Sequence, residues 1–339
     1  DEDIYINKYD NLSNWHERNL LDREIDIYIL TSSLAGEHVF NFGQIEWRLA
    51  NSSSHNEHPS THEFRMQEQS AFDQSLLPNE IVESNDLIFA ANNDTNETYL
   101  YQGEVYRERS YENDFSAQLD YKYSFVLNKN LTVNIKAGSK YIRKSKDRES
   151  EDFDARLDKP NSQFETNHRQ YGNDNFEFEW FNGQPSIYNY IDDGFDANNF
   201  LNGDYDFGLR INKDELNHLL SSYLLDSLYN ASTEAMLDDF NVVEEIGSYY
   251  LMSEINYGKT LMFLPGFRLE KTIVDLTGRK NAIGINDEGV TFPTVADTNA
   301  QASYENIFPM FHIKYKPFKW FDIRLAFTQS ISRPQLKFM

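Results

Sequence analysis

The chain has 339 residues, a formal net charge of −24 and no cysteine. This charge argues against a nucleic-acid partner, because phosphate binding depends on lysine and arginine. The lack of cysteine excludes disulfide scaffolds, thiolate zinc sites and cysteine nucleophiles.

At this length the chain could form two ordinary soluble domains or one large β architecture. It contains no run of ~18–20 apolar residues, the length that a membrane-spanning helix needs. A membrane β-barrel stays open, because its strands are half-apolar segments of ~10 residues. The start at Asp1-Glu2-Asp3 is not a signal peptide, and the chain stops soon after a predicted strand. We therefore expect an internal piece of a longer protein.

The first predicted hairpin spans residues 24–52. Its alternating apolar residues are Ile25, Ile27, Ile29, Ile45, Trp47 and Leu49. This two-residue period is that of a strand with one apolar and one polar face. A glycine-containing corner near residues 36–43 separates the two runs, and a long polar connection, residues 53–109, follows.

The second hairpin, residues 110–144, has the most regular pattern, with its turn predicted at Asn128-Lys129-Asn130. Its apolar face consists of Tyr111, Phe115, Ala117, Leu119, Tyr121, Tyr123, Phe125, Leu131, Val133, Ile135, Ala137 and Tyr141. Residues 145–241 form the next polar connection. Within it, a stretch resembling a capping box at Asn212-Lys213-Asp214-Glu215 precedes leucines at helical spacing, which predicts one helix near residues 213–229.

Two further hairpins, residues 242–277 and 305–333, complete the series, with residues 278–304 between them. Their tight turns are predicted at Gly258-Lys259 and at Pro317-Phe318-Lys319-Trp320. In the last strand the large apolar residues occupy odd positions and the polar or small residues occupy even positions. The predicted strand therefore needs an apolar environment on one side and a polar one on the other.

Four hairpins with tight turns thus alternate with three long polar connections. Soluble sandwiches show turn signals every 8–12 residues, whereas outer-membrane barrels alternate short periplasmic turns with long external loops. Aromatic residues flank all four tight turns, as in the aromatic girdle of a membrane barrel. The predicted fold is all-β: part of a transmembrane, antiparallel up-and-down β-barrel, with about eight strands, external loops at 53–109, 145–241 and 278–304, and one loop helix.

Three stretches carry a family resemblance. One contains a Y-x-N-x-x-P strand followed by an R-L-A-x-x-x-S-x-S-R-P strand, through Tyr304, Asn306, Pro309, Arg324, Leu325, Ala326, Ser330, Ser332, Arg333 and Pro334. The second, residues 249–272, ends in P-G-x-R-x-E, through Pro265, Gly266, Arg268 and Glu270. The third and weakest is residues 36–59. Together these hairpins resemble the barrel of TonB-dependent outer-membrane receptors.

The resemblance implies a 22-stranded barrel plugged by an N-terminal domain. It places the barrel in the outer membrane of a Gram-negative cell, with its loops facing the exterior, and implies ligand import into the periplasm. The implied partners are outer-membrane lipid, the plug of the full-length chain, the TonB complex acting through that plug, and a small-molecule or oligosaccharide ligand. The sequence shows no plug, TonB-contacting box or closing C-terminal strand, so we expect this portion alone not to transport.

The polar residues at alternate positions of the predicted strands are expected to line the lumen. These are Glu46, Arg48, Asp120, Lys122, Lys136, Lys140, Arg268, Glu270, His312, Lys314, Asp322 and Arg324. We expect most of these charges to satisfy one another and the plug surface. A direct ligand role is expected instead in the external loops.

The connection 145–241 is rich in aromatic and acidic residues. Its candidate ligand-binding residues are Trp180, Phe181, Tyr188, Tyr190, Asp192, Asp193 and Asp196. Aromatic rings among carboxylates suit stacking on sugars or wrapping a chelate, and they equally suit a loop that folds on its own small core. The carboxylates could hold calcium, but their spacing is not that of an EF-hand, so we predict no resident cofactor.

One histidine cluster, His55, His58 and His62, lies beside acidic residues. Pro59 interrupts the helical register that a zincin motif requires. These histidines are therefore weak metal candidates, and we predict no metal site.

Two alternative functions stay open. One is a secreted all-β carbohydrate-binding protein or glycoside hydrolase, which would need two carboxylates ~5–10 Å apart across a groove. The other is a passive porin-like barrel without a plug. We predict no enzyme and no catalytic residue, and the ligand cannot be identified from the sequence. Apolar faces packed together as a dry centre would exclude the importer.

Overall fold

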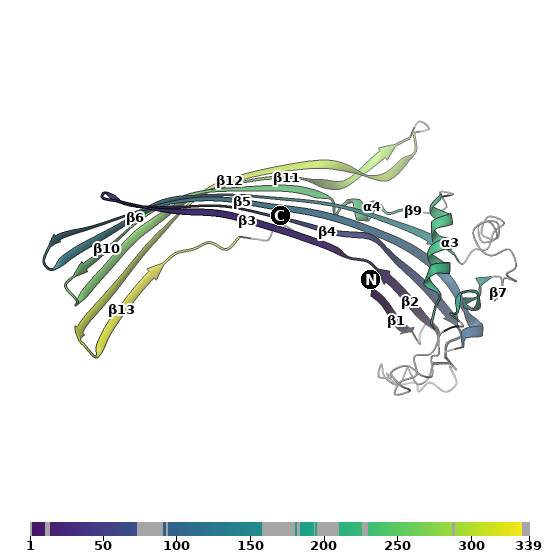
Figure 1. The fold of residues 1–339 in the computed structure, drawn as a ribbon. Helices are drawn as coiled ribbons and strands as arrows, with labels where there is room; N and C mark the ends of the chain where they lie inside the picture. The colour runs from purple at the N-terminus through teal and green to yellow at the C-terminus, as the bar shows by residue number, and fades with distance from the viewer. Residues whose placement is uncertain are drawn as a thin grey trace. The chain divides into compact units, whose positions relative to one another are not determined.

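The computed structural model describes residues 2–10, 14–72, 91–92, 94–157, 180–181, 184–192, 194, 210–225, 230–286 and 289–333. One 11-stranded sheet dominates them, in the order β1-β2-β4-β5-β6-β10-β11-β12-β13, with β3 also paired to β4 and β9 to β6 (Figure 1). Its strands are β1 Glu2–Asp10, β2 Trp15–Arg23, β3 Asp26–Phe40, β4 Gly43–Gln69, β5 Thr98–Asn128, β6 Leu131–Arg156, β9 Asn230–Ala231, β10 Phe240–Tyr257, β11 Leu261–Ile285, β12 Thr291–Phe318 and β13 Phe321–Thr328.

The remaining described elements are short. Strands β7 (Trp180–Phe181) and β8 (Gln184–Pro185) form a separate pair. The helices are η1 (Thr95–Glu97), η2 (Ile187–Tyr190), α3 (Lys213–Leu225) and α4 (Thr233–Met236). In the part of the chain that the structure describes, no helix has the length and apolar character needed to cross a membrane.

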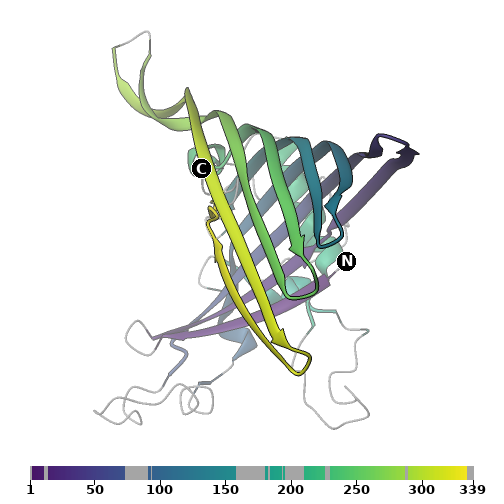
Figure 2. The same ribbon diagram turned by 90° about the vertical axis from the view of Figure 1, so that its left-hand side faces the viewer.

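The predicted fold class is confirmed: the chain forms an open, antiparallel, up-and-down sheet whose order begins at β1 and ends at β13. Tight turns join β5 to β6 at Lys129–Asn130, β10 to β11 at Gly258–Thr260, and β12 to β13 at Lys319–Trp320. Figure 2 shows these three turns at the same end of the strands. Gly258 has a φ of 57°, a left-handed conformation that glycine adopts without a steric cost. The β3–β4 turn lies at Asn41–Phe42, inside the predicted corner.

The strands extend much further than the hairpins read from the sequence. The connection 278–304 is mostly strand rather than loop, because β11 and β12 stay paired over 25 residues of β11, from Leu261 to Ile285. Strands β4, β5 and β6 likewise run into the expected loops 53–109 and 145–241. Strands β1 and β2 form a hairpin in residues 2–23, where no hairpin was predicted. The sheet therefore has more than eight strands. In these extensions many polar residues fall on both faces, so the two-residue hydrophobic period fades there although the strand continues.

The chain divides into two compact units. Unit 1 comprises Asp1–Asp26, Glu57–Glu108 and Ser150–Ala235, and unit 2 comprises Ile27–Asn56, Arg109–Glu149 and Met236–Met339. Strands β4, β5 and β6 contribute residues to both units.

Unit 1 has an ordinary apolar core. Its buried cluster comprises Leu20, Phe64, Met66, Leu100, Val105, Ala155, Leu157, Ile187, Tyr190, Ile211, Leu216, Leu219 and Leu220. The last three residues lie on one face of α3, at the spacing that a helix buries. The helix predicted near 213–229 is present as α3 over Lys213–Leu225, and residues 226–229 lie outside the described residues. The backbone N–H of Glu215 donates to Asn212 Oδ1 at 3.4 Å, as the capping pattern predicted.

Unit 2 has the opposite arrangement of polarity. On β10–β13 most of its exposed apolar residues lie at odd positions, among them Tyr249, Leu251, Phe267, Leu269, Ile307, Ile323, Leu325 and Phe327. Its buried polar residues share the even parity and include Asp120, Glu244, Ser248, Glu270 and Thr272. Water normally drives apolar side chains inward and leaves charges outside. These faces therefore suit a lipid environment on the odd side, and they contradict the dry centre of a soluble sandwich.

The apolar face has a defined limit along the strands. Five rows of odd residues run from Tyr257–Leu261–Tyr315, at the turns, to Tyr249–Leu269–Ile307. In the next row Lys271 pairs with Glu305 at 3.1 Å. Rows two residues apart at ~3.3 Å per residue give a band ~26 Å long along the strands. The rows span nine residues of each strand, which matches the ~9–11 residues of a tilted membrane-spanning strand.

Candidate functional site on the polar face

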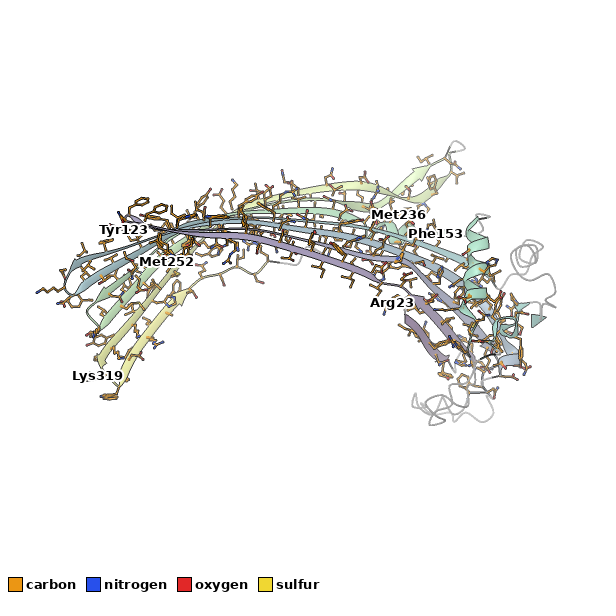
Figure 3. The ribbon with its side chains drawn as sticks, in the orientation of Figure 1. Arg23, Tyr123, Phe153, Met236, Met252 and Lys319 are labelled. Atoms are coloured by element: carbon orange, nitrogen blue, oxygen red, sulfur yellow. The ribbon has the colours of Figure 1, made fainter. Side chains whose placement is uncertain are left out.

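The polar face of unit 2 carries most of the charged residues that the sequence assigned to a lumen. Side chains project from both faces of the strands, as Figure 3 shows, with Lys319 at the β12–β13 turn. The register of β10, β11 and β12 aligns Ser248, Glu270 and Asn306 across the sheet, with Thr272 opposite Tyr304 one step along. Polar residues from strands far apart in sequence therefore form continuous rows.

An arginine–glutamate cluster lies at the centre of these rows. Arg333 Nη2 donates to Glu270 Oε2 at 2.5 Å, and Arg333 Nε lies 3.8 Å from Glu244 Oε1. Arg268 forms an ion pair with the other carboxylate oxygen of Glu270. Both glutamate side chains are only 5% exposed, so they depend on these guanidinium groups for compensation of their charge.

The motif residues gather around this cluster. Tyr304, Asn306 and Arg333 come from the final motif, and Glu270 from the P-G-x-R-x-E motif, so two motifs separated in sequence share one network. At Gly266, a Cβ would lie 2.9 Å from that of Met252, which shows why this motif position favours glycine. The other motif residues lie as follows: Pro265 in β11, Pro309 in β12, Arg324 in β13, Ser332 just beyond β13, and Pro334 outside the described residues.

A second cluster surrounds Asp120 of β5. Tyr250 of β10 donates its hydroxyl hydrogen to Asp120 Oδ1, and Gln118 Nε2 donates to Oδ2 at 2.7 Å. Strand β6 lies between β5 and β10, and Gly138 sits opposite Tyr250 in the register. A Cβ on Gly138 would lie 2.5 Å from Asp120 Oδ1, so glycine allows the two side chains to meet across β6.

A cavity of about 440 Å³ adjoins the Asp120 cluster. Its lining includes Glu46, Trp47, Arg48, Gln118, Asp120 and Lys136. Lys122 Nζ pairs with Glu46 Oε1, and Lys136 Nζ lies 5.7 Å from the centre of the Tyr250 ring. The cavity thus presents both signs of charge and one indole, a surface suited to polar solutes or to a polar protein segment.

The remaining predicted lumen residues lie apart from these two clusters. Near the β12–β13 turn, Arg324 Nη2 pairs with Asp322 at 2.9 Å and Lys314 lies 4.0 Å from the same carboxylate. His312 faces Leu264 and Ala326 in the register. The backbone carbonyl of Lys140 accepts a hydrogen bond from Ser248.

The candidate ligand-binding residues of the 145–241 connection lie in different environments. Tyr190 is buried within the core of unit 1, which favours the small-core alternative for this ring. Tyr188 is 41% exposed, and Asp192 lies 3.7 Å from Arg210. Trp180 and Phe181 form β7, while Asp193 and Asp196, which also carried the calcium alternative, lie outside the described residues.

The three histidines all lie on β4. In a regular strand the even positions His58 and His62 face one way and His55 faces the other. His55 stacks on Tyr111 with ring centres 4.2 Å apart. Burial lowers the pKa of His62, and among the described residues no three metal-binding side chains are grouped.

Several polar residues of unit 1 were missed by the sequence analysis. His16 lies between Glu68 Oε2 and Asn7 Oδ1, each 3.1 Å from a ring nitrogen. Arg65 contacts both Glu63 and Glu104, and burial, together with the charge of Asp152, raises the pKa of Glu104 to about 7. The signal for these networks is weak, because their partners come from different strands whose register is not written in the local pattern.

Comparisons with known proteins agree with this architecture. A family model described as "TonB dependent receptor-like, beta-barrel" matches residues 48–339. No curated protein matches the sequence.

Solved structures similar to this chain are import receptors. They include the ferric-catecholate receptor Fiu from E. coli K12 in its closed form (9% identity, TM-score 0.37, covering 96% of this chain and 47% of that chain). The unliganded ferric citrate transporter FecA (9%, 0.32, 95% and 40%) and the siderophore receptor PiuA from Acinetobacter baumannii (11%, 0.29, 94% and 47%) are also similar. The chain thus spans about half the length, or less, of these receptors. With a family match over most of its residues, the chain belongs to the TonB-dependent receptors, within their β-barrel domain.

Proposed function

We propose that this chain forms part of the wall of an outer-membrane importer that moves a scarce ligand into the periplasm. The ligand is a metal chelate, such as a siderophore, or an oligosaccharide. Energy for import comes from the TonB complex acting through a plug domain in the lumen. The membership of the family supports this proposal.

The observation that carries the proposal is the reversed polarity of unit 2. Exposed apolar residues on one face and buried charges on the other are stable when lipid contacts the first face and a polar lumen lies against the second. On this proposal the turns joining β5–β6, β10–β11 and β12–β13 lie on the periplasmic side.

The two polar clusters then have distinct roles. The cluster of Arg268, Arg333, Glu244 and Glu270 is charge-balanced and its two glutamates are buried, which suits a fixed part of the wall that contacts the plug. The cavity beside Asp120 has a volume of about 440 Å³ and is lined by side chains of both charges, which suits transient contact with the moving ligand or plug. The ring of Tyr188 in unit 1 is exposed, which makes it one aromatic candidate for first contact with the ligand.

Uptake measurements in a deletion strain test this proposal. Cells without the gene and cells complemented with it are given ⁵⁵Fe-labelled catecholate, ⁵⁵Fe-labelled hydroxamate or a fluorescent maltodextrin. We expect one of these to accumulate only in complemented cells and accumulation to stop when a protonophore removes the energy source.

Matched variants connect uptake to the polar face. Asp120→Asn should slow uptake, because it weakens the network beside the cavity, whereas Glu305→Gln, an exposed carboxylate at the edge of the apolar band, should not. Uptake that persists with the protonophore would identify a passive porin instead. Release of soluble sugar products without accumulation would identify a hydrolase.

A further inference from the structure

Three tight turns of unit 2 each carry a lysine that the transport proposal does not use. Lys129 lies in the β5–β6 turn, Lys259 in the β10–β11 turn and Lys319 in the β12–β13 turn, where Figure 3 labels it, and all three are exposed. In the part of the chain that the structure describes, none of these three ammonium groups forms an ion pair. We call these three residues the basic rim.

Charge is segregated at this end of the strands. Acidic residues outnumber lysine and arginine by 55 to 31 in the whole chain. The turns with their flanking residues, 126–133, 256–262 and 315–321, nevertheless contain lysine and neither aspartate nor glutamate. The next carboxylate along the chain, that of Asp322, is already paired with Arg324 at 2.9 Å. The basic rim is therefore a locally positive region in a chain whose net charge is −24.

Backbone hydrogen bonds hold the three turns next to one another. The N–H of Gly258 donates to the carbonyl of Asn130 at 2.6 Å, and the N–H of Lys316 donates to the carbonyl of Thr260 at 2.7 Å. Figure 2 shows the three turns at the same end of the strands. Two strand spacings of ~4.8 Å separate successive turns, so successive lysines are on the order of 10 Å apart. This separation is about the Debye length in physiological salt, so the lysines act on an anionic surface together.

Exposed apolar side chains adjoin the basic rim. The side chain of Trp320 is 82% exposed, and its ring stacks on that of Phe318 with the ring centres 5.6 Å apart. Lys259 is two residues from Tyr257 and from Leu261, which belong to the first row of the apolar band. A lysine at the edge of an apolar surface extends its ammonium group toward the polar head groups of a membrane, and tryptophan is enriched at the same depth. The basic rim thus lies where the head groups of lipids against the band would be.

We propose that the basic rim binds the phosphate groups of anionic phospholipids in the leaflet at the turn end of the barrel. This inference rests on the proposed function, because it requires lipid against the apolar band. Clusters of lysine beside a membrane attract anionic lipids, whose acyl chains would contact the band. The opposite limit of the band differs, since Lys271 is paired there with Glu305 at 3.1 Å, and just beyond it Arg143 is paired with Glu245 at 3.6 Å. The charge of the turn end, unlike that of the opposite limit, is complementary to an anionic head group.

Native mass spectrometry of the full-length receptor tests the proposal. The receptor in neutral detergent is titrated with dioleoyl phosphatidylglycerol or with dioleoyl phosphatidylcholine, which has the same acyl chains and no net charge, and the lipid retained by the folded protein is measured. Each lysine near an anionic surface contributes about fivefold in affinity, so we expect phosphatidylglycerol to bind at least about tenfold more tightly than phosphatidylcholine. Equal affinities overturn the proposal without bearing on uptake.

Two triple variants locate the bound lipid. Combining Lys129→Gln, Lys259→Gln and Lys319→Gln should reduce the preference for phosphatidylglycerol to about threefold or less. The matched control combines Lys8→Gln, Lys271→Gln and Lys280→Gln, which remove the same charge from exposed side chains away from the turns, and it should retain the preference.

Electrophoresis without heating confirms that each variant is folded. Because the comparison of the two lipids uses the unaltered receptor, equal affinities there overturn the proposal even if a variant does not fold. A preference that persists without the basic rim, or an equal loss in the matched control, also overturns it.

Discussion

Three residues of β13 allow the lipid-facing assignment to be tested as a function of depth. Ile323, Leu325 and Phe327 are 52%, 57% and 48% exposed, so their side chains are nearly equally accessible. They occupy the first, second and third of the five apolar rows, counted from the turns. In water, an arginine at any of the three should have a similarly small effect. In a bilayer, the depth of each row should decide the cost.

The expected cost rises toward the middle of the band. Ile323→Arg lies at the edge and should cost about 0–1 kcal/mol, and Phe327→Arg lies in the central row and should cost about 2–4 kcal/mol. Leu325→Arg, ~7 Å along the strand from the edge row, should fall between them. Phe327→Ala separates the cost of the charge from the loss of the stacked ring of Phe311, whose centre lies 5.7 Å away.

Guanidinium titrations of the full-length receptor folded into phosphatidylcholine vesicles measure these costs, with the slower-migrating unfolded form followed by electrophoresis without heating. Thr328→Arg is the matched control, because Thr328 follows Phe327 on the opposite face and aligns with Met310. Its cost should be below that of Phe327→Arg. A flat profile across the three rows, or equal costs at 327 and 328, would refute the assignment of faces.

Three further predictions concern the polar networks. Arg333→Gln should cost about 1.5–3 kcal/mol, because Glu244 and Glu270 are then buried without their main counter-charge, and adding Glu270→Gln should restore part of the loss in the same titration. Glu104 has a pKa of about 7 in the folded chain against 4.5 as its ordinary value, so its protonation stabilises unit 1 fully below pH 4.5 and this contribution is lost as the pH rises through about 7. Glu104→Gln should therefore flatten the pH dependence of amide hydrogen exchange in β4 and β5 over that range, and an unchanged slope would contradict this origin. Asp22→Ala should lower the opening free energy of α3 by about 1–2 kcal/mol in hydrogen exchange, with β10 and β11 unaffected, since the hydrogen bonds that Lys213 and Asn217 donate to Asp22 are both lost.

The sequence predicted the parts of the fold in which apolar and polar residues alternate along a strand. Strands in the apolar band alternate between an exposed apolar face and a polar face, so the hairpins around Asn128–Asn130 and Gly258 were readable from a single sequence. The α3 helix was readable for a similar reason, from its cap and from leucines at helical spacing. Beyond Lys271 the alternation of large apolar and polar residues fades, and the same strands were mistaken for loops.

The candidate site was predicted only in part. The alternation of apolar and polar residues placed Asp120 and Glu270 on the polar face, but it gave no information on their hydrogen-bond and ion-pair partners. Tyr250 reaches Asp120 across an intervening strand through the space at Gly138, and this depends on registers that a local pattern does not contain. Glu244 has the same even parity as the predicted residues and could have been included on that basis. Tyr190 was grouped with ligand-binding aromatics because composition does not distinguish a ring on the surface of a loop from a ring in its core.

The uninterrupted pairing of β11 with β12 restricts which insertions and deletions these strands can accept during evolution. Because successive side chains alternate between faces, one inserted residue inside β11 would reverse the orientation of every side chain on one side of it. Lysines and glutamates would then enter hydrocarbon, and leucines would enter the aqueous interior. Length changes of one residue should therefore survive at Gly258–Thr260 or near Asn286–Val290, where the chain reverses direction. Within the ladder, insertions or deletions of an even number keep each side chain on its own face, and a single extra residue does so only as a β-bulge.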